Sequence, residues 1–341
     1  MTNGDYAAQG LARSGLPGDV LAWRDVLPDG PVPADDDRAV FRTTRARFLA
    51  ERHWATAAEV EEDLLARDAR LDGLSATDGI VLWFEPDLYD QLQLIQVLAR
   101  LARRDAASRP SVSIVPADLM LGSLAPAKFR PLYDARRPIA DIDLAHGLAA
   151  WEAFTSSTPD ALVALVTRLD AEIAPRTYDA NDSVRLPHLA ASLRRMLEEY
   201  PDADTGLSRS ERQICEALTS GPRTLSALFR AAHHASESWP WLGDWSFAWY
   251  VQRLSDVAKP LVTHVNGSRV LAPIPGPDDS GFWERSVMLT PFGSDVVRAR
   301  ADMVSVNGID RWIGGVSLTA GRYWRWDGTR QRTVESGDRQ P

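Results

Sequence analysis

Hydrophobic and polar positions over the first 135 residues predict an α/β domain. Mostly apolar runs predict buried strands, which are 20–23, 79–84 and 111–115. Apolar residues at helical spacing predict three helical segments, which are 6–12, 37–72 and 88–103. Strand, helix and strand in this order imply parallel pairing, so we expect a Rossmann-like parallel sheet. Only Met1 and Thr2 precede the first turn, so we expect the first strand to be short.

The rest of the chain is expected to form three further parts. Residues 136–204 are mostly helical and predict a helical connector. Residues 205–302 predict three helices, two strands and a last helix, which together indicate a winged-helix-like α+β domain. A capping box of Ser208 and Glu211 begins the first of these helices. Residues 303–341 form a tail rich in tryptophan and glycine, which we expect to dock on the N-terminal domain.

Charge and cysteine content narrow the partners and the compartment. The net charge is −9, which disfavours broad charge-driven binding of nucleic acid. The single cysteine, Cys215, precludes an internal disulfide framework, and no signal peptide is evident, so a cytoplasmic location is expected. No apolar run approaches the ~20 residues that span a bilayer, so no membrane partner is expected. The oligomeric state cannot be inferred from these features.

The strongest chemical signal follows the predicted strand 79–84. Glu85, Asp87, Asp90 and Gln91 lie where that strand passes into a helix. The three carboxylates are candidate catalytic residues and candidate Mg²⁺ ligands, and Gln91 is a candidate ligand-binding residue. The alternative is helix capping, because acids in a first turn interact favourably with the helix dipole.

Two further motifs lie near the N-terminus. Asn3, Gly4 and Asp5 form a turn before a helix, where backbone N–H groups can bind an anion. Trp23, Arg24 and Asp25 follow another predicted strand and could stack on a ligand or clamp it. The alternative for this second motif is a buried Trp23 with a surface pair of Arg24 and Asp25.

These motifs are expected to converge. Because ligands bind beyond the carboxyl ends of parallel strands, we predict that Asp5, Asp25 and Glu85 lie in one pocket, where Asp5 and Asp25 would also be catalytic. Asp310 and Arg311 of the tail would complete that pocket and bind the ligand.

The motifs also resemble a known family. The segments that carry the resemblance are Asn3-Gly4-Asp5, Trp23-Arg24-Asp25-Val26-Leu27, 82–91, Leu207-Ser208-x-x-Glu211 and 307–316. Together they resemble the bacterial "domain of unknown function 1835" proteins over nearly the whole chain. The resemblance implies an uncharacterised cytosolic bacterial protein and brings no reaction with it. Pro86 departs from the family, whose members often carry histidine there, and members usually have a few more apolar residues before Asn-Gly-Asp.

Two functions fit these observations. In the first, the carboxylate cluster of the α/β domain binds a small polar, nucleotide-like ligand, with Mg²⁺ as a candidate cofactor, in an enzyme or a binding protein. In the second, the chain is a winged-helix transcriptional regulator with an N-terminal sensor domain. The basic face of that regulator would comprise Arg209, Arg212, Arg223, Arg230 and Arg253. The aromatic character of residues 239–249 disfavours DNA as a partner, because a DNA reader needs several phosphate contacts.

Overall fold

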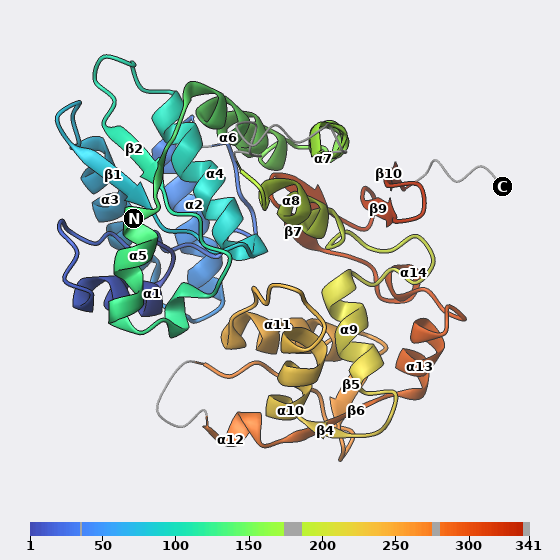
Figure 1. Cartoon of the computed structure of the whole chain (residues 1–341). Coiled ribbons are helices and arrows are strands. Elements are labelled where there is room, and N and C mark those ends of the chain that lie inside the picture. Colours follow the sequence, from blue (N-terminus) through green and yellow to red (C-terminus); the bar gives the residue numbers. More distant parts are fainter. Residues whose placement is uncertain (35, 174–185, 275–279, 337–341) are drawn as a thin grey trace.

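The computed structural model describes residues 1–34, 36–173, 186–274 and 280–336 (Figure 1). A short parallel pair of strands lies in its N-terminal lobe, the name used here for residues 1–154. Strand β1 (Gly79–Leu82) pairs in parallel with β2 (Ser111–Ile114), and helix α4 (Leu88–Ala102) connects them. Strand β3 (Arg137–Pro138) adds to β2 in the antiparallel direction. The sheet is therefore mixed, whereas the sequence pattern predicted parallel strands.

The beginning of the chain extends this sheet on the other side of β1. Thr2 forms parallel bridges to Trp83 and to Ala22. The Thr2 N–H donates to the Leu21 carbonyl at 3.1 Å, and the Trp23 N–H donates to the Thr2 carbonyl at 2.8 Å. The strand expected at 20–23 is thus reduced to a single bridge, and the short first strand lies between it and β1.

Helices cover both faces of the sheet. They are α1 (Asp5–Arg13), α2 (Arg38–Glu51), α3 (Ala57–Asp72), α4, η1 (Leu121–Ser123), η2 (Pro126–Lys128), α5 (Phe129–Asp134) and α6 (Asp141–Phe154). Helix α4 is buried along nearly its whole length because it is apolar on most sides. It packs closely on α6: a Cβ atom at Gly147 would lie 2.3 Å from the Leu98 Cβ.

The middle and C-terminal parts are largely helical. Their elements are α7 (Asp160–Ile173), α8 (Leu189–Leu197), α9 (Arg209–Ala217), β4 (Arg223–Thr224), α10 (Leu225–Phe229), the π-helical turn η3 (Arg230–His234), α11 (Asp244–Ser255), β5 (Val262–His264), α12 (Ser280–Trp283), β6 (Ser286–Leu289) and α13 (Pro291–Val297). Residues 174–185 of the expected connector lie outside the described residues. The strands form an antiparallel sheet in the order β4-β6-β5. The predicted capping box of Ser208 and Glu211 at α9 is confirmed.

The tail returns toward the N-terminal lobe. It comprises α14 (Met303–Asn307), β7 (Arg311–Ile313), β8 (Val316–Leu318), β9 (Trp324–Asp327) and β10 (Arg332–Glu335). The turn between β7 and β8 meets the end of α6, where the Gly315 N–H donates to the Phe154 carbonyl at 3.0 Å. The Gly314 carbonyl accepts from the Val32 N–H at 2.9 Å. Both hydrogen bonds attach the tail to residues of the N-terminal lobe.

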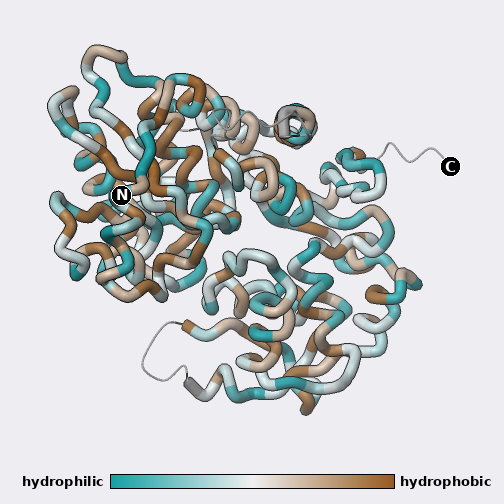
Figure 2. The backbone as a smooth tube through the Cα atoms, viewed as in Figure 1, coloured by the Kyte–Doolittle hydropathy of each residue, from teal (hydrophilic) through white to brown (hydrophobic). Residues whose placement is uncertain are grey.

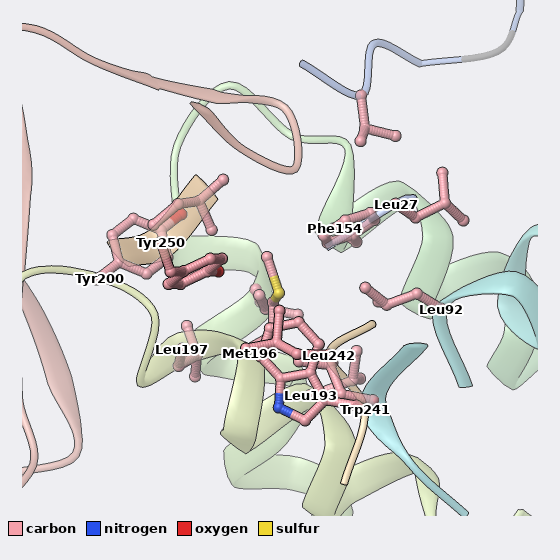
Figure 3. Packing of buried hydrophobic residues seen from close by; sticks show 14 of the residues in the cluster. Leu27, Leu92, Phe154, Leu193, Met196, Leu197, Tyr200, Trp241, Leu242 and Tyr250 are labelled. Carbon is pink, nitrogen blue, oxygen red and sulfur yellow. The ribbon is translucent and has the colours of Figure 1, made fainter. Parts of the chain in front are cut away.

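One hydrophobic cluster runs through the lobes. It includes Leu92 of α4, Phe154 of α6, Met196 of α8 and Tyr250 of α11, and Figure 3 shows these side chains close to one another. Hydrophobic stretches pass through the interior of the molecule, and many outer turns are hydrophilic (Figure 2). Among the described helices, none has both the length and the apolar character needed to cross a membrane.

A series of ion pairs joins the N-terminal lobe to α9, α11 and β7. Arg52, next to the end of α2, pairs with Asp29 at 3.0 Å, and Arg253 of α11 lies 3.7 Å from the same carboxylate. Arg253 also lies 3.5 Å from Glu211 of α9, which pairs with Arg311 of β7 at 2.9 Å. We call these five residues the junction ion-pair chain. Because its members come from separate elements, it fixes the orientation of α11 on the N-terminal lobe.

The tight turn between β7 and β8 generates a prediction. A Cβ atom at Gly315 would lie 2.0 Å from the Thr155 carbonyl oxygen, so Gly315→Ala must push the turn away from α6. We expect a loss of about 3 kcal/mol in the free energy of unfolding, at the upper end of overpacking costs. Gly321→Ala is the matched control, because no atom lies within 4 Å of its added Cβ. Urea denaturation of both variants tests this, and equal stabilities would show that the turn does not bear on α6.

Candidate functional site

The residues after β1 form a buried turn that begins helix α4. Asp87 is the N-cap of α4, and its Oδ1 accepts from the Asp90 N–H at 3.0 Å. The Gln91 side chain donates to the Glu85 carbonyl at 2.8 Å, which closes the turn. The Ser192 hydroxyl of α8 donates to the Pro86 carbonyl at 3.3 Å. The turn is therefore held by its own helix and by α8.

Asp90 links this turn to the beginning of the chain. One of its oxygens accepts from the Asn3 amide and the other from the Glu85 N–H, the second bond at 2.6 Å. Burial raises the pKa of Asp90 well above its usual range, and the nearby Asp87 carboxylate raises it further. Burial also raises the pKa of Asp87, to about 7. These two acids compete for ionisation because both are desolvated and close together.

Glu85 has a different partner. Its Oε1 accepts from the backbone N–H groups of Leu121 and Gly122 at 2.6 and 3.1 Å, which ties the turn to η1. Burial raises the pKa of Glu85, while these two N–H groups act against that shift. The structure thus brings together five of the predicted site residues, which are Asn3, Glu85, Asp87, Asp90 and Gln91.

Asp5 and Asp25 do not share a pocket with Glu85, contrary to the prediction. Asp5 is the first residue of α1, after the N-cap Gly4, and its half-exposed side chain pairs with Arg24 at 2.6 Å. Asp25 is wholly buried and pairs with Arg45 at 2.8 Å. An acid on the surface and an acid sealed in an ion pair cannot line one cleft. The position of these two acids near predicted strands did not indicate that each of them pairs with a different arginine.

Trp23 and Arg24 agree in part with the alternative interpretation of their motif, which was a buried Trp23 with a surface pair of Arg24 and Asp25. Trp23 is fully buried, its indole N–H donates to Gln96 at 2.8 Å, and the Arg67 guanidinium lies 4.1 Å from its ring centroid. Arg24 is a surface residue, but its partners are Asp5 and Asp63 instead of Asp25. The partners of Trp23 and Arg24 thus lie outside the turn 85–91.

Asp310 and Arg311 do not complete the acidic turn either. Asp310 is exposed. Arg311 belongs to the junction ion-pair chain, where it pairs with Glu211, and it also donates to the Glu199 carbonyl at 3.0 Å. The predicted Mg²⁺ site has no support in the geometry, since no three acidic, histidine or cysteine side chains among the described residues are grouped to hold a metal ion.

A cavity of about 210 Å³ opens beside Asp87 at the junction of the lobes, and we call it the junction cavity. Its walls are the turn 86–88, α8, Arg209 of α9 and the loop 237–241. Arg195 in this wall is buried and pairs with Glu199 at 2.7 Å and with Glu237 at 2.8 Å. A larger groove of about 600 Å³ adjoins the cavity and shares Arg209 and Glu198 with it.

The loop 237–241 depends on a buried histidine. His233 Nε2 accepts from the N–H groups of Trp241 and Leu242, both at 2.8 Å. The imidazole is therefore neutral with its proton on Nδ1, and burial lowers the pKa of His233 to about 3. No local motif marks this role, because the partners of His233 are backbone N–H groups eight and nine residues further along the chain. No family model, curated protein or solved structure matches the chain.

Asp87 generates a prediction about pH. Its pKa is about 7 in the folded protein and close to 3.8 when unfolded, so the folded state binds more protons between these values. Asp87 therefore lowers stability progressively as the pH rises from about 4 to about 7. Asp87→Asn keeps the helix cap and removes this titration. We expect the free energy of unfolding of the variant to equal that of the wild type near pH 4 and to exceed it by about 4 kcal/mol at pH 8.

Urea denaturation from pH 4 to pH 8 measures this difference. The contribution of His233 to the free energy of unfolding has the opposite pH dependence, because it decreases as the pH falls below about 6.5. His233 is present in both proteins, so its contribution cancels when the two are compared. The same difference at every pH would contradict a raised pKa for Asp87.

Proposed function

We propose that this protein binds a small polar ligand in the junction cavity and that Asp87 is its principal recognition group. The observation that supports this most directly is the state of Asp87, a buried carboxylate that lines the cavity and forms no ion pair within the described residues. Buried charges are normally paired. A carboxylate that faces a cavity without a cation is therefore suited to a ligand.

Asp87 would also suit acid–base chemistry. A carboxyl group with a pKa near 7 can both give and take a proton at neutral pH, which is what a general acid or base needs. Asp90 and Glu85 would then tune Asp87 instead of contacting the ligand, because neither of them lines the cavity. Of the five acids expected to be catalytic, only Asp87 is then retained in that role.

A nucleotide-like ligand would extend beyond the cavity. The adjoining groove of about 600 Å³ offers the additional space, and Arg209 lies between the two hollows. We also propose that the chain belongs with the "domain of unknown function 1835" proteins and functions in the cytoplasm. Both of these proposals rest on the sequence motifs and composition alone.

A second candidate function has one observation in its favour. The order of helices and strands from α9 to β6, with the sheet order β4-β6-β5, is the order expected of a winged helix. We propose this domain type on that ground. Its third helix, α11, would be the one that reads DNA, yet Trp249 lies under Arg52 at 4.3 Å and Arg253 lies near Asp29. The N-terminal lobe thus covers side chains that DNA would need.

Blocking the cavity should abolish ligand binding. Ala191 is an exposed residue of α8 that lines the cavity, so Ala191→Trp should fill the opening without disturbing the core. A thermal-shift screen of nucleosides, nucleotides, sugars and amino acids should find a compound that raises the Tm of the wild type by about 3 °C or more. We expect at least about tenfold weaker binding of that compound to the variant.

Ala66→Trp is the matched control, because Ala66 is an exposed helical alanine of α3 that does not line the cavity. It should bind the compound as the wild type does. A screen without any stabilising compound, or equal binding by both tryptophan variants, would refute the proposed site.

The intact 341-residue chain should not bind duplex DNA tightly. The covered face of α11 and the paired arginines leave few cations for phosphate contacts, and non-specific binding requires them. In a fluorescence anisotropy titration at ~150 mM salt we expect a Kd weaker than about 1 µM. A tighter, salt-dependent Kd would favour the regulator over the binding protein.

A further inference from the structure

The acids of the junction cavity differ in their partners. Glu198 pairs with Arg209 at 2.7 Å, and Glu237 pairs with Arg195 at 2.8 Å and with Arg209 at 3.2 Å. The donors to Asp87 within the described part of the chain are backbone N–H groups, those of Asp90, Tyr89 and Asp87 itself. The cavity therefore contains one carboxylate that has no cationic side chain as a partner among the described residues.

A ligand with an ammonium group would supply the missing charge. Opposite charge within about 4–6 Å favours the ionised form of a carboxylate, so an ammonium would offset the desolvation that keeps Asp87 partly protonated. A neutral hydroxyl or amide would gain less, because it brings no positive charge to the carboxylate. The position of Asp87 thus favours an amine over a neutral polar group.

Two partly exposed arginines of the cavity have N–H donors for an anionic group of the same ligand. The side chains of Arg194 and Arg209 are 30% and 37% exposed, in contrast to the buried Arg195. Each guanidinium has five N–H donors. Arg194 uses one nitrogen for Asp170, and Arg209 uses two for Glu198 and Glu237. Donors are left over on both residues, and their fork geometry matches a carboxylate.

The size and the apolar wall limit the ligand further. The volume of about 210 Å³ equals that of about seven water molecules, at ~30 Å³ each, which suits a single amino acid better than a nucleotide. Trp239 and Trp241 of the loop 237–241 line the cavity. Trp239 lies edge-on to His188 at 6.4 Å between ring centroids, so its ring is held in place on one side. A hydrophobic side chain could pack on this wall.

We infer that the ligand of the junction cavity is a small zwitterion of the amino-acid type. Its ammonium group lies at Asp87, its carboxylate at Arg194 and Arg209, and its side chain against Trp239. This inference rests on the proposed function, since it assigns a chemical class to the ligand of the same cavity.

The test compares three sets of probes on the intact 341-residue chain. These are the twenty L-amino acids, their N-acetyl derivatives, and a set of nucleosides and neutral sugars. Thermal shift identifies binders, and isothermal titration calorimetry gives their Kd. We expect at least one free amino acid to bind and its N-acetyl derivative to bind at least about tenfold more weakly, because acetylation removes the positive charge.

Asp87→Asn should weaken binding of that amino acid at least about tenfold while keeping the helix cap. Asp37→Asn is the matched control, because Asp37 caps α2 in the same way, is exposed and does not line the cavity. It should bind as the wild type does. The pH dependence gives a second readout: binding should strengthen from pH 5 to pH 8 in the wild type and stay flat in Asp87→Asn.

The outcomes separate this inference from the proposed function. If a nucleoside, sugar or N-acetyl derivative binds in a manner that Ala191→Trp blocks and Asp87→Asn does not, the cavity is a ligand site but the amino-acid class is wrong. If no probe of any set binds, both proposals fail. Equal binding of an amino acid to the wild type and to Asp87→Asn also overturns the inference.

Discussion

The junction ion-pair chain is the interaction on which the arrangement of this molecule depends. Arg253 lies between Asp29 of the N-terminal lobe and Glu211 of α9, at 3.7 and 3.5 Å, and two of its guanidinium nitrogens are buried without a hydrogen-bond acceptor among the described residues. Such a group costs free energy unless charges nearby compensate it. Removing either carboxylate would leave a buried cation poorly compensated, so the lobes and α11 are held in one arrangement. The junction cavity exists only in that arrangement, because its walls come from α4, α8, α9 and the loop 237–241.

Local sequence signals predicted the elements well where one segment determines its own structure. The apolar run after Gly79 and the helical spacing after Asp87 gave β1 and α4, and the Ser208–Glu211 capping box gave the beginning of α9. Each signal depends on neighbours within a few residues, so it can be read from the chain directly. The antiparallel addition of β3 depends on contacts that no local pattern reports.

The site was predicted less well because its chemistry depends on distant partners. Asp25 and Asp87 both follow apolar segments, yet Arg45 neutralises Asp25 at 2.8 Å while no arginine reaches Asp87 within the described residues. The difference arises from α2, which brings Arg45 under the loop after Trp23 through bonds to Asp25, Val26 and Asp29. Helix capping, the alternative considered for the acidic turn, accounts for Oδ1 of Asp87. It does not account for the absence of a cation at this acid.

The two buried titratable groups near the cavity, His233 and Asp87, change the stability of the protein in opposite directions as the pH rises. His233 must stay neutral to accept the two N–H groups that shape the loop 237–241, and this arrangement is favoured above about pH 6.5. Asp87 is neutral at lower pH, and its ionisation near pH 7 introduces a charge without a cationic partner among the described residues into the turn 86–88, another wall of the same cavity. Both groups are neutral in the folded protein between about pH 3 and pH 7, yet each lowers the free energy of unfolding over part of this range, His233 below about pH 6.5 and Asp87 above about pH 4. A cationic ligand would remove the cost of Asp87 near neutral pH, where His233 has no such cost, because it stabilises the ionised carboxylate. Ligand binding would then add stability to the joined lobes in proportion to RT ln(1 + [L]/Kd), because only the joined arrangement forms the cavity.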